Sequence, residues 1–274
     1  MPWWRELGGD GGGTLTRTED FSDRFSARFT GRVENYRQFR PRYPDAVAAV
    51  LEKECGLKSG STIVDIAAGT GILAQIFLER GHHVIAVEPN EEMRAACATL
   101  VERYPRLRCV DGVAEATGLP SHAFDLITVG QALHWFDLKR ARAEFARILR
   151  PDGWCAVIYN ERRLSGDGFH DAYEKLLRDF GIDYEVVQRQ HLTAEKIQGF
   201  FAPAEMWRAA FPNAQLLTIE ALEGRIVSSS YMPKPGHVRY AAMLAGIAKQ
   251  FGEHQEGGAV RLEYECVVSY GRVE

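Results

Sequence analysis

The stretch IVDIAAGTGIL, residues 63–73, decides the fold of this chain, because an apolar run leads at once into two glycines two positions apart. Gly69, Gly71 and Ala74 match the spacing G-x-G-x-x-G/A, which is typical of a loop between a buried strand and a helix. Asp65 lies just upstream, where its carboxylate would repel a pyrophosphate but attract an ammonium or sulfonium group. Glu88 ends the next apolar run, where an acid can accept hydrogen bonds from both ribose hydroxyls. The stretch therefore predicts a site for a nucleoside with an amino-acid tail and no phosphate.

Strands and helices alternate along the chain around this loop. Apolar runs predict strands at 61–68, 82–89, 107–112, 123–131 and 154–161, and amphipathic segments predict helices at 44–56, 71–81, 90–105 and 138–153. Continuous apolar strands that alternate with helices are typical of a parallel sheet covered on both faces. Because crossovers are right-handed, we expect a doubly wound open sheet, whose ligands bind at the carboxyl ends of its strands.

The alternation stops after residue 161. Patterns there predict helices at 168–182, 193–202 and 236–254, and strands at 214–222 and 258–273. The whole chain is therefore predicted to be an α/β protein with a mostly parallel, seven-stranded sheet and a helical insertion between strands 5 and 6.

Four parts follow from these patterns. Residues 1–20 are expected to be disordered, because the run GGDGGG cannot pack. Residues 21–161 are expected to form the cofactor-binding core with an N-terminal lid segment, and residues 162–213 the insertion on the substrate side. Residues 214–274 are expected to complete the core sheet, with helices between its last strands.

Composition excludes several function classes. The 274 residues carry a formal net charge of -4, which argues against nucleic acid as a partner. No apolar run approaches the roughly 18 residues that cross a bilayer, so no membrane contact is expected. The cysteines are scattered and form no C-x-x-C pair: Cys55, Cys97, Cys109, Cys155 and Cys266. They predict reduced thiols in a cytoplasmic protein, with neither a disulfide framework nor a metal site.

Several motifs, taken together, resemble a known family. They are VDIAAGTGIL, VIAVEPNEEM, VDGVAEATGLPSHAFDLITVGQALHWFD and RILRPDGW, with FRPRYP, GRIVSSSYMP and YECVVSYGR in the flanking regions. In this order they resemble the class I S-adenosylmethionine-dependent methyltransferases, in particular the type 11 small-molecule subgroup and its trans-aconitate methyltransferase-like members. The resemblance covers roughly residues 25 to 272. It implies S-adenosylmethionine as cofactor and a small acid, methylated on oxygen, as acceptor.

The same resemblance implies a set of site residues. Those expected to bind the cofactor are Tyr36, Arg40, Asp65, Ala67, Gly69, Thr70, Gly71, Glu88, Pro89, Met93, Gly112, Val113, Ala114 and Gln131. Those expected to line the substrate pocket are Tyr43, His134, Trp135 and Tyr231. Arg40 has two uses open to it, because an arginine fork can hold the cofactor carboxylate or an acidic substrate.

Two positions depart from the family pattern. Ala67 and Ala68 stand in place of a glycine and the residue after it, and alanine can serve there if its φ stays below zero. We therefore expect a slightly altered loop with no loss of function. Val113 stands where the family usually has an acid, so Val113 and Ala114 are expected to contact adenine through their backbone only.

His134 is the first candidate for a general base, because histidine titrates near neutral pH. A phenol or alcohol acceptor would need such a base, whereas a carboxylate or free amine would not. A satisfied structural histidine is the alternative for His134, and His82 and His83 are expected at the solvated surface. Two other functions stay open: a dehydrogenase that uses NAD, which Asp65 opposes, and a non-catalytic metabolite-binding protein. The oligomeric state is not predicted.

Overall fold

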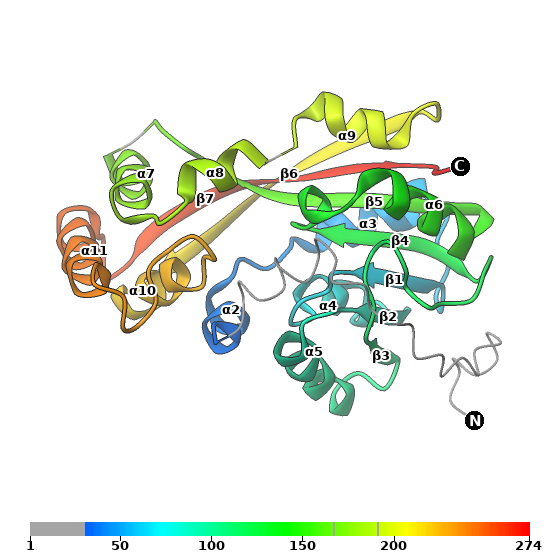
Figure 1. The fold of residues 1–274 in the computed structure, drawn as a ribbon, viewed down its shortest axis with the longest axis horizontal. Helices are drawn as coiled ribbons and strands as arrows, with labels where there is room; N and C mark the ends of the chain where they lie inside the picture. Colours follow the sequence, from blue (N-terminus) through cyan, green and yellow to red (C-terminus); the bar gives the residue numbers. More distant parts are fainter. Residues whose placement is uncertain (1–30, 167, 191) are drawn as a thin grey trace.

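The computed structural model describes residues 31–166, 168–190 and 192–274, and the expected disorder of residues 1–20 lies outside this part of the chain. Seven strands of the described residues form one sheet in the order β3-β2-β1-β4-β5-β7-β6 (Figure 1). They are β1 (Thr62–Ile66), β2 (His83–Val87), β3 (Leu107–Val110), β4 (Phe124–Gly130), β5 (Leu149–Arg162), β6 (Met206–Leu217) and β7 (Val260–Gly271). β1 to β5 are parallel, and β7 runs antiparallel to both β5 and β6. The predicted mostly parallel sheet of seven strands is confirmed.

Helices cover both faces of the parallel strands. One face packs on α3 (Asp45–Glu54), α4 (Ile72–Leu78) and α5 (Glu91–Ala98), and η3 (Thr99–Glu102) extends α5. The other face packs on α6 (Leu138–Ile148) and α9 (Ala194–Phe201). Neighbouring strand residues such as Ile63 and Val64 are fully buried in opposite cores, because successive side chains of a strand point to opposite faces. This double burial explains the continuous apolar runs of the sequence.

A third hydrophobic cluster lies where β6 and β7 extend beyond the parallel strands (Figure 1). It joins those strand ends to α7 (Gly168–Phe180), α8 (Tyr184–Gln190), α10 (Ile219–Val227) and α11 (Tyr240–His254). α7, α8 and α9 follow β5 and precede β6, as the predicted insertion requires. None of the helices in the described ranges is long and apolar enough to cross a membrane.

The prediction of a strand at 214–222 is wrong in its bounds. β6 begins at Met206, and α10 occupies most of the second half of the predicted segment. Thr218 starts this helix, because its hydroxyl accepts a hydrogen bond from the backbone N–H of Ala221. β6 also contains Pro212, which an edge strand tolerates since one side of it forms no ladder.

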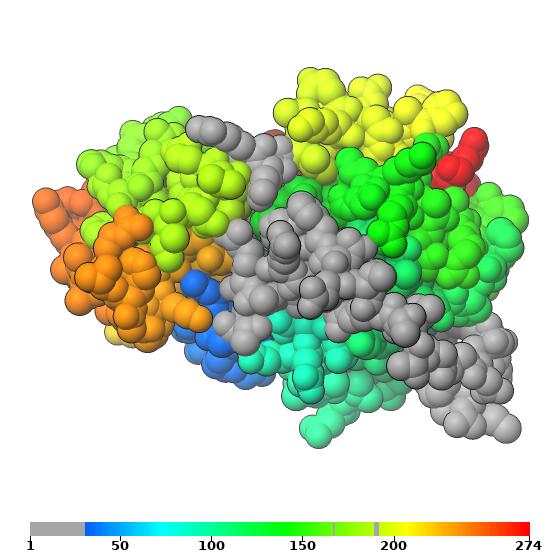
Figure 2. All heavy atoms as spheres, in the orientation of Figure 1, coloured from blue at the N-terminus to red at the C-terminus, as the bar shows by residue number. Residues whose placement is uncertain are grey.

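The helix α2 (Val33–Phe39) lies between α5 and α10. In Figure 2 its blue surface separates the orange segment that includes α10 from the cyan and green core. The guanidinium of Arg32 donates hydrogen bonds to backbone oxygens just beyond the end of α10, including that of Ser229 at 2.9 Å. Gly224 of α10 lies so close to Phe39 that a Cβ there would come within 2.1 Å of the ring. Helix α2 is thus fixed as one wall of the ligand-binding edge.

Candidate active site

Two adjoining clefts open at the carboxyl ends of the parallel strands. The first holds about 730 Å³ of space, part of it open to solvent. Its lining includes these predicted residues: Tyr36, Ala67, Gly69, Glu88, Pro89, Met93, Val113, Ala114, Gln131 and Trp135. The second is larger, and its lining includes these: Tyr36, Arg40, Tyr43, Asp65, Ala67, Gln131, His134, Trp135 and Tyr231. Because Tyr36, Ala67, Gln131 and Trp135 line both, the two clefts meet at these side chains.

Three predicted residues line neither cleft: Thr70, Gly71 and Gly112. Gly71 begins α4 with a φ of 81°, and a Cβ there would lie 2.8 Å from the sulfur of Cys97. Gly112 is held against Val87, whose side chain would lie 3.0 Å from a Cβ at this position. Thr70 is 2% exposed. Gly71 and Gly112 therefore allow close packing behind the first cleft.

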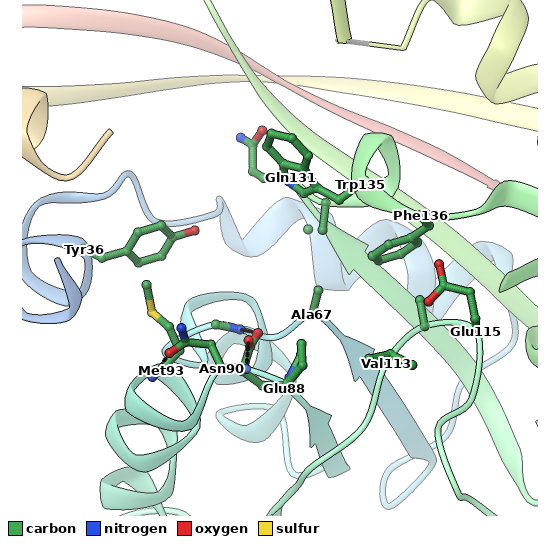
Figure 3. Close-up of a pocket in the computed structure, with 15 residues that line it drawn as sticks. Tyr36, Ala67, Glu88, Asn90, Met93, Val113, Glu115, Gln131, Trp135 and Phe136 are labelled. Atoms are coloured by element: carbon green, nitrogen blue, oxygen red, sulfur yellow. Dashed lines mark hydrogen bonds between the residues drawn. The ribbon is translucent and has the colours of Figure 1, made fainter. Parts of the chain in front are cut away.

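Acidic and apolar groups surround the first cleft from three sides. Figure 3 shows Tyr36 reaching in from α2 and Trp135 and Phe136 on the opposite wall, with Glu88 and Met93 on the side of β2 and α5. Sequence reasoning missed several of the lining residues: Asn90, Gly130, Ala132 and Phe136. Most of them are next to predicted site residues in the chain. Extending the prediction to all residues that follow the strand ends would have found them.

Glu88 is a buried carboxylate with acceptor capacity left over. Its Oε2 accepts a hydrogen bond from the backbone N–H of Gly69 and its Oε1 one from that of Asn90, each at 2.8 Å (Figure 3). A carboxylate offers about four acceptor positions, so each oxygen can take a further hydroxyl. Burial raises the pKa of Glu88, while the two backbone N–H groups act to lower it. The residue thus fixes the loop after β1 and offers acceptors to a diol.

Asp65 is the second buried acid, at the carboxyl end of β1. Its Oδ1 accepts a hydrogen bond from the hydroxyl of Thr128 at 2.9 Å, and its Oδ2 is buried with no hydrogen-bond partner among the described residues. Burial, together with the nearby charge of Glu88, raises the pKa of Asp65 to about 7. An unpartnered buried carboxyl oxygen at a cleft is costly, so this position favours a cationic ligand.

Ala67 adopts a left-handed backbone with a φ of 54°, so the expectation that its φ stays below zero is wrong. The turn at Ala67 directs the next backbone N–H, that of Ala68, to the carbonyl oxygen of Val87 at 3.1 Å. This hydrogen bond joins the glycine loop to the end of β2. Gln131, which also lines both clefts, has a φ of 59°. Such conformations are uncommon outside glycine and concentrate at functional sites.

Guanidinium groups distinguish the second cleft. Arg225 of α10 is 6% exposed, and its partners are neutral: the hydroxyl of Tyr264 at 3.3 Å and that of Ser229 at 3.2 Å. Within the described part of the chain it forms no ion pair. Burial acts to lower the pKa of Arg225, but the surrounding tyrosines raise it overall, so the group stays charged.

Three more arginines line the same cleft: Arg40, Arg162 and Arg208. Arg40 lies over the ring of Tyr36 at 4.9 Å and donates to the backbone oxygen of Ser228 at 3.0 Å, while its Nε is buried without a partner. Burial and the charge of Arg225 lower the pKa of Arg40. Arg162, at the end of β5, pairs with Glu174 at 2.6 Å but keeps a buried, unpartnered Nη1. The carboxylates of Asp65 and Glu161 also line this cleft.

Sequence reasoning missed Arg162 and Arg225 as site residues. Arg225 lies in the GRIVSSSYMP motif, and Arg162 ends the buried strand β5, where a charged residue signals the carboxyl edge of the sheet. His134 and Tyr159 complete this wall, with His134 Nδ1 at 3.1 Å from the hydroxyl of Tyr159. Tyr43 approaches Gly130 so closely that a Cβ there would lie 2.7 Å from the Tyr43 hydroxyl.

No group of three or more His, Cys, Asp or Glu side chains within residues 31–166, 168–190 and 192–274 could hold a metal ion.

Part of the chain is similar to known methyltransferases. Residues 64–157 match the family model described as a methyltransferase domain. An uncharacterised methyltransferase of Schizosaccharomyces pombe is 29% identical over 202 residues, which cover 73% of this chain and 77% of that protein. An uncharacterised methyltransferase of Mycobacterium tuberculosis is 36% identical over 138 residues, but the match covers 50% of this chain and only 54% of that protein.

Solved structures match the fold. A candidate type II methyltransferase from Anaeromyxobacter dehalogenans has a TM-score of 0.64 and 24% identity, and the match covers 86% of this chain and 98% of that one. A Haemonchus contortus phosphoethanolamine N-methyltransferase, solved in complex with phosphomonomethylethanolamine and S-adenosylhomocysteine, has a TM-score of 0.54 and 18% identity, and the match covers 94% of this chain and 60% of that one. At these identities the likeness concerns the fold alone.

Proposed function

We propose that this chain is a methyltransferase of the S-adenosylmethionine-dependent class and that it methylates an oxygen of a small organic acid bound in the second cleft; the similarity of residues 64–157 to a methyltransferase domain supports the class. The observation that carries this proposal is Arg225, a buried cation with neutral partners only. A buried charge without a counterion is expensive, and an anionic ligand would compensate it. The Nη1 of Arg162 and the Nε of Arg40, both buried and unpartnered, add donors of the same kind.

The first cleft and its junction with the second fit the cofactor. S-adenosylmethionine, when bound, supplies an electrophilic methyl group on a sulfonium sulfur. Asp65 offers an unpartnered carboxyl oxygen to the cationic end, and Glu88 offers acceptors to the ribose hydroxyls. Pro89, Met93 and Val113 supply walls for the adenine. In this proposal the other predicted cofactor residues that line either cleft keep the roles that the sequence assigned to them, with Arg40 at either the cofactor carboxylate or the acceptor.

Catalysis in this proposal is mainly positioning. Side chains at the junction, among them Tyr36, Gln131 and Trp135, would hold the acceptor oxygen in line with the methyl group and exclude water. Such alignment can supply roughly 7 to 11 kcal/mol of the acceleration. Residues 21–161 would serve the cofactor and residues 162–213 would add the substrate side. A carboxylate acceptor brings its own lone pair, so no base is required.

A hydroxyl acceptor is the second candidate, because His134 lines the second cleft and could take a proton.

Turnover of an acid panel tests the proposal. Release of S-adenosylhomocysteine should appear with small carboxylic acids, and Arg225→Met should raise the KM for the acid about 10- to 100-fold, since a hydrogen bond to a charged group contributes roughly 1.5–3 kcal/mol. The dissociation constant of S-adenosylmethionine, measured by calorimetry, should stay within about threefold of the wild-type value.

Arg103→Met is the matched control, because Arg103 is 73% exposed and pairs with Glu79 far from both clefts. It should leave KM unchanged. Methyl transfer to amines but to no acid, or an unchanged KM in Arg225→Met, would contradict the proposed acceptor class. Loss of S-adenosylmethionine binding in Arg225→Met would instead show that the variant damages the fold or the cofactor site.

A further inference from the structure

A chain of hydrogen bonds runs from the end of α2 to Arg225. Nε2 of Gln215, on β6, donates to the backbone oxygen of Phe39 at 2.9 Å, and Oε1 of Gln215 lies 2.7 Å from the hydroxyl of Tyr264 on β7. The same hydroxyl lies 3.3 Å from Nε of Arg225. Tyr264 and Arg225 line the second cleft, whereas Gln215 lines neither cleft. The chain therefore reaches the cleft from behind its wall.

The chemistry of the groups fixes the direction of each bond. The carbonyl oxygen of Phe39 can only accept, so Gln215 turns its NH₂ group to Phe39 and its carbonyl oxygen to Tyr264. That amide oxygen carries no proton, so the hydroxyl of Tyr264 must donate its single proton to it. The acceptor positions of the hydroxyl are then left for the Nε–H group of Arg225, which can only donate. Gln215 thus decides which way the hydroxyl faces.

The guanidinium that this chain holds has two weak partners. Besides the contact with Tyr264, Nη1 of Arg225 donates to Oγ of Ser229 at 3.2 Å, and both distances lie at the long end of the normal range. Both partner oxygens are neutral, and Nη2 of Arg225 forms no hydrogen bond within the described ranges. The partners therefore fix the orientation of the group but leave its charge and further donors to an anion in the cleft.

The other end of the chain is anchored. Phe39 ends α2, and its ring packs so closely on Gly224 of α10 that no Cβ would fit there. Arg40, the next residue, donates to the backbone oxygen of Ser228 at 3.0 Å. The same helix carries Tyr36, which lines both clefts. The orientation of the guanidinium is thus set relative to the helix that forms one wall of the cofactor cleft.

We propose that Gln215 is a positioning residue for the acceptor, because through Tyr264 it holds Arg225 in the orientation that receives the carboxylate. This proposal rests on the proposed function and deepens it, since it names a residue outside the cleft on which acid binding depends. An amide suits the role, because it anchors the hydroxyl without adding a charge that would compete with the substrate. Tyr264 is 5% exposed, so without Gln215 its hydroxyl proton must find another acceptor, and its oxygen no longer faces Arg225.

Solvent exchange tests the chain without turnover. In ligand-free protein labelled with ¹⁵N in arginine, the Nε–H signal of Arg225 is assigned as the one absent from Arg225→Met. An N–H group that donates within the protein exchanges slowly with water, so exchange should be slow in the wild type and at least about tenfold faster in Gln215→Leu. Tyr264→Phe should have the same effect, because it removes the acceptor itself.

Gln250→Leu is the matched control for this measurement, because Gln250 is a half-buried amide on α11 that lines neither cleft. It should leave the exchange of the Arg225 signal at the wild-type rate. Unchanged exchange in both Gln215→Leu and Tyr264→Phe would overturn the proposal, since another contact would then hold Arg225. Faster exchange in Tyr264→Phe alone would show that Tyr264 needs no anchor, and this result would also overturn the role of Gln215.

Kinetics at saturating S-adenosylmethionine then show whether acid binding depends on the chain. Gln215→Leu should raise the KM for the acid about 3- to 10-fold, as for one lost neutral hydrogen bond, with kcat within about threefold of the wild-type value. The dissociation constant of S-adenosylmethionine should not change, because Gln215 lines neither cleft. A fall in kcat with an unchanged KM would contradict the proposal.

A double variant separates a chain from two independent contacts. Because Gln215 acts only through Tyr264, Gln215→Leu combined with Tyr264→Phe should raise the KM no more than Tyr264→Phe alone, by about 10-fold. Effects of the two substitutions that multiply would contradict the proposal. If no acid is a substrate, the proposed function fails, while the exchange measurement still decides whether Gln215 positions Arg225.

Discussion

The two clefts differ in how the chain builds them and in the charge that they bury. The two buried acids come from the ends of neighbouring strands: Glu88 of the first cleft follows β2, and Asp65, which lines the second cleft two residues before Ala67, lies at the carboxyl end of β1. The arginines of the second cleft come from the residue after α2, the end of β5, β6 and α10, which are far apart in the sequence. The acids are brought together by a single βαβ unit, whereas the arginines come together only when the whole sheet has formed.

The buried charges lower the stability of the ligand-free protein. Buried carboxyls on one side and buried guanidiniums on the other are both unfavourable without counterions, because the protein interior solvates charge poorly. Asp65 and Arg225 are 1% and 6% exposed. Both groups therefore lower the stability of the ligand-free protein, and a ligand group of opposite charge would compensate each of them. Variants that remove either charge should increase stability and weaken ligand binding.

The largest effect is expected for Asp65→Asn. Burial raises the pKa of Asp65 to about 7, whereas an unfolded aspartate titrates near 3.9. A raised carboxyl pKa means that stability is lost as pH rises from about 4 to 7, by up to about 4 kcal/mol, and stays lost above pH 7. The amide of the variant has no such titration. Urea unfolding of the ligand-free protein should show the variant several kcal/mol more stable than wild type at pH 8 and about equally stable at pH 4.

Affinity should move the other way. S-adenosylmethionine should bind the wild type more tightly as pH rises through about 7, because the ionised carboxylate attracts its positive charge. Calorimetry near pH 7 should detect proton release on binding. In Asp65→Asn the affinity should be weaker and nearly independent of pH over this range. If Asp65→Asn is less stable than wild type at pH 8, or binds S-adenosylmethionine with the wild-type pH dependence, then Asp65 does not bind the positive charge of the cofactor.

Glu88→Gln should weaken cofactor binding without touching the second cleft. The amide oxygen of the variant can still accept a hydrogen bond from the backbone N–H of either Gly69 or Asn90. Its NH₂ group then faces the second of these N–H groups and cannot accept from it. We expect the dissociation constant of S-adenosylmethionine to rise about 100-fold, or about 2.7 kcal/mol, with the KM of the acceptor within about threefold at saturating cofactor. Glu91→Gln, at an exposed position in the first turn of α5, is the control. If Glu88→Gln changed only the KM of the acceptor, the first cleft would be the acceptor site and not the cofactor site.

The first cleft was largely predictable, because its chemistry follows from local order. Parallel strands end at the same edge of a sheet, so Asp65 and Glu88 had to lie close together once β1 and β2 were recognised. The second cleft was not. Arg162 and Arg225 come together through the pairing of β5, β7 and β6, and the bounds of β6 were themselves wrong in the prediction. No local periodicity encodes that pairing.

His82 shows the same limit on a smaller scale. The sequence placed it at the solvated surface, which is wrong, since it is 1% exposed. Its Nε2 lies 2.9 Å from Oε1 of Glu52 on α3, a helix separated from it by the whole of β1 and α4. The Glu52 carboxylate also pairs with Arg80, which lowers the pKa of Glu52. A turn between helix and strand is exposed by default, and only its tertiary partner buries it.

The smallest effect is expected where the two clefts meet. Ala67 holds a φ of 54°, a conformation that costs a residue with a Cβ roughly 1–2 kcal/mol, while glycine loses more entropy on folding, by about 0.4–1 kcal/mol. The balance predicts that Ala67→Gly raises the free energy of unfolding by about 0.5–1 kcal/mol. Ala68, whose φ is not positive, should respond with the opposite sign, so Ala68→Gly should lose about 0.4–1 kcal/mol. Denaturant unfolding of this pair isolates the backbone effect, and equal losses in both variants would mean that the left-handed turn at Ala67 is not strained.

Since Ala67 lines both clefts, its methyl group also contacts the space where they meet. If Ala67→Gly weakens the binding of both ligands, then the methyl group, and not only the backbone conformation, separates the two clefts.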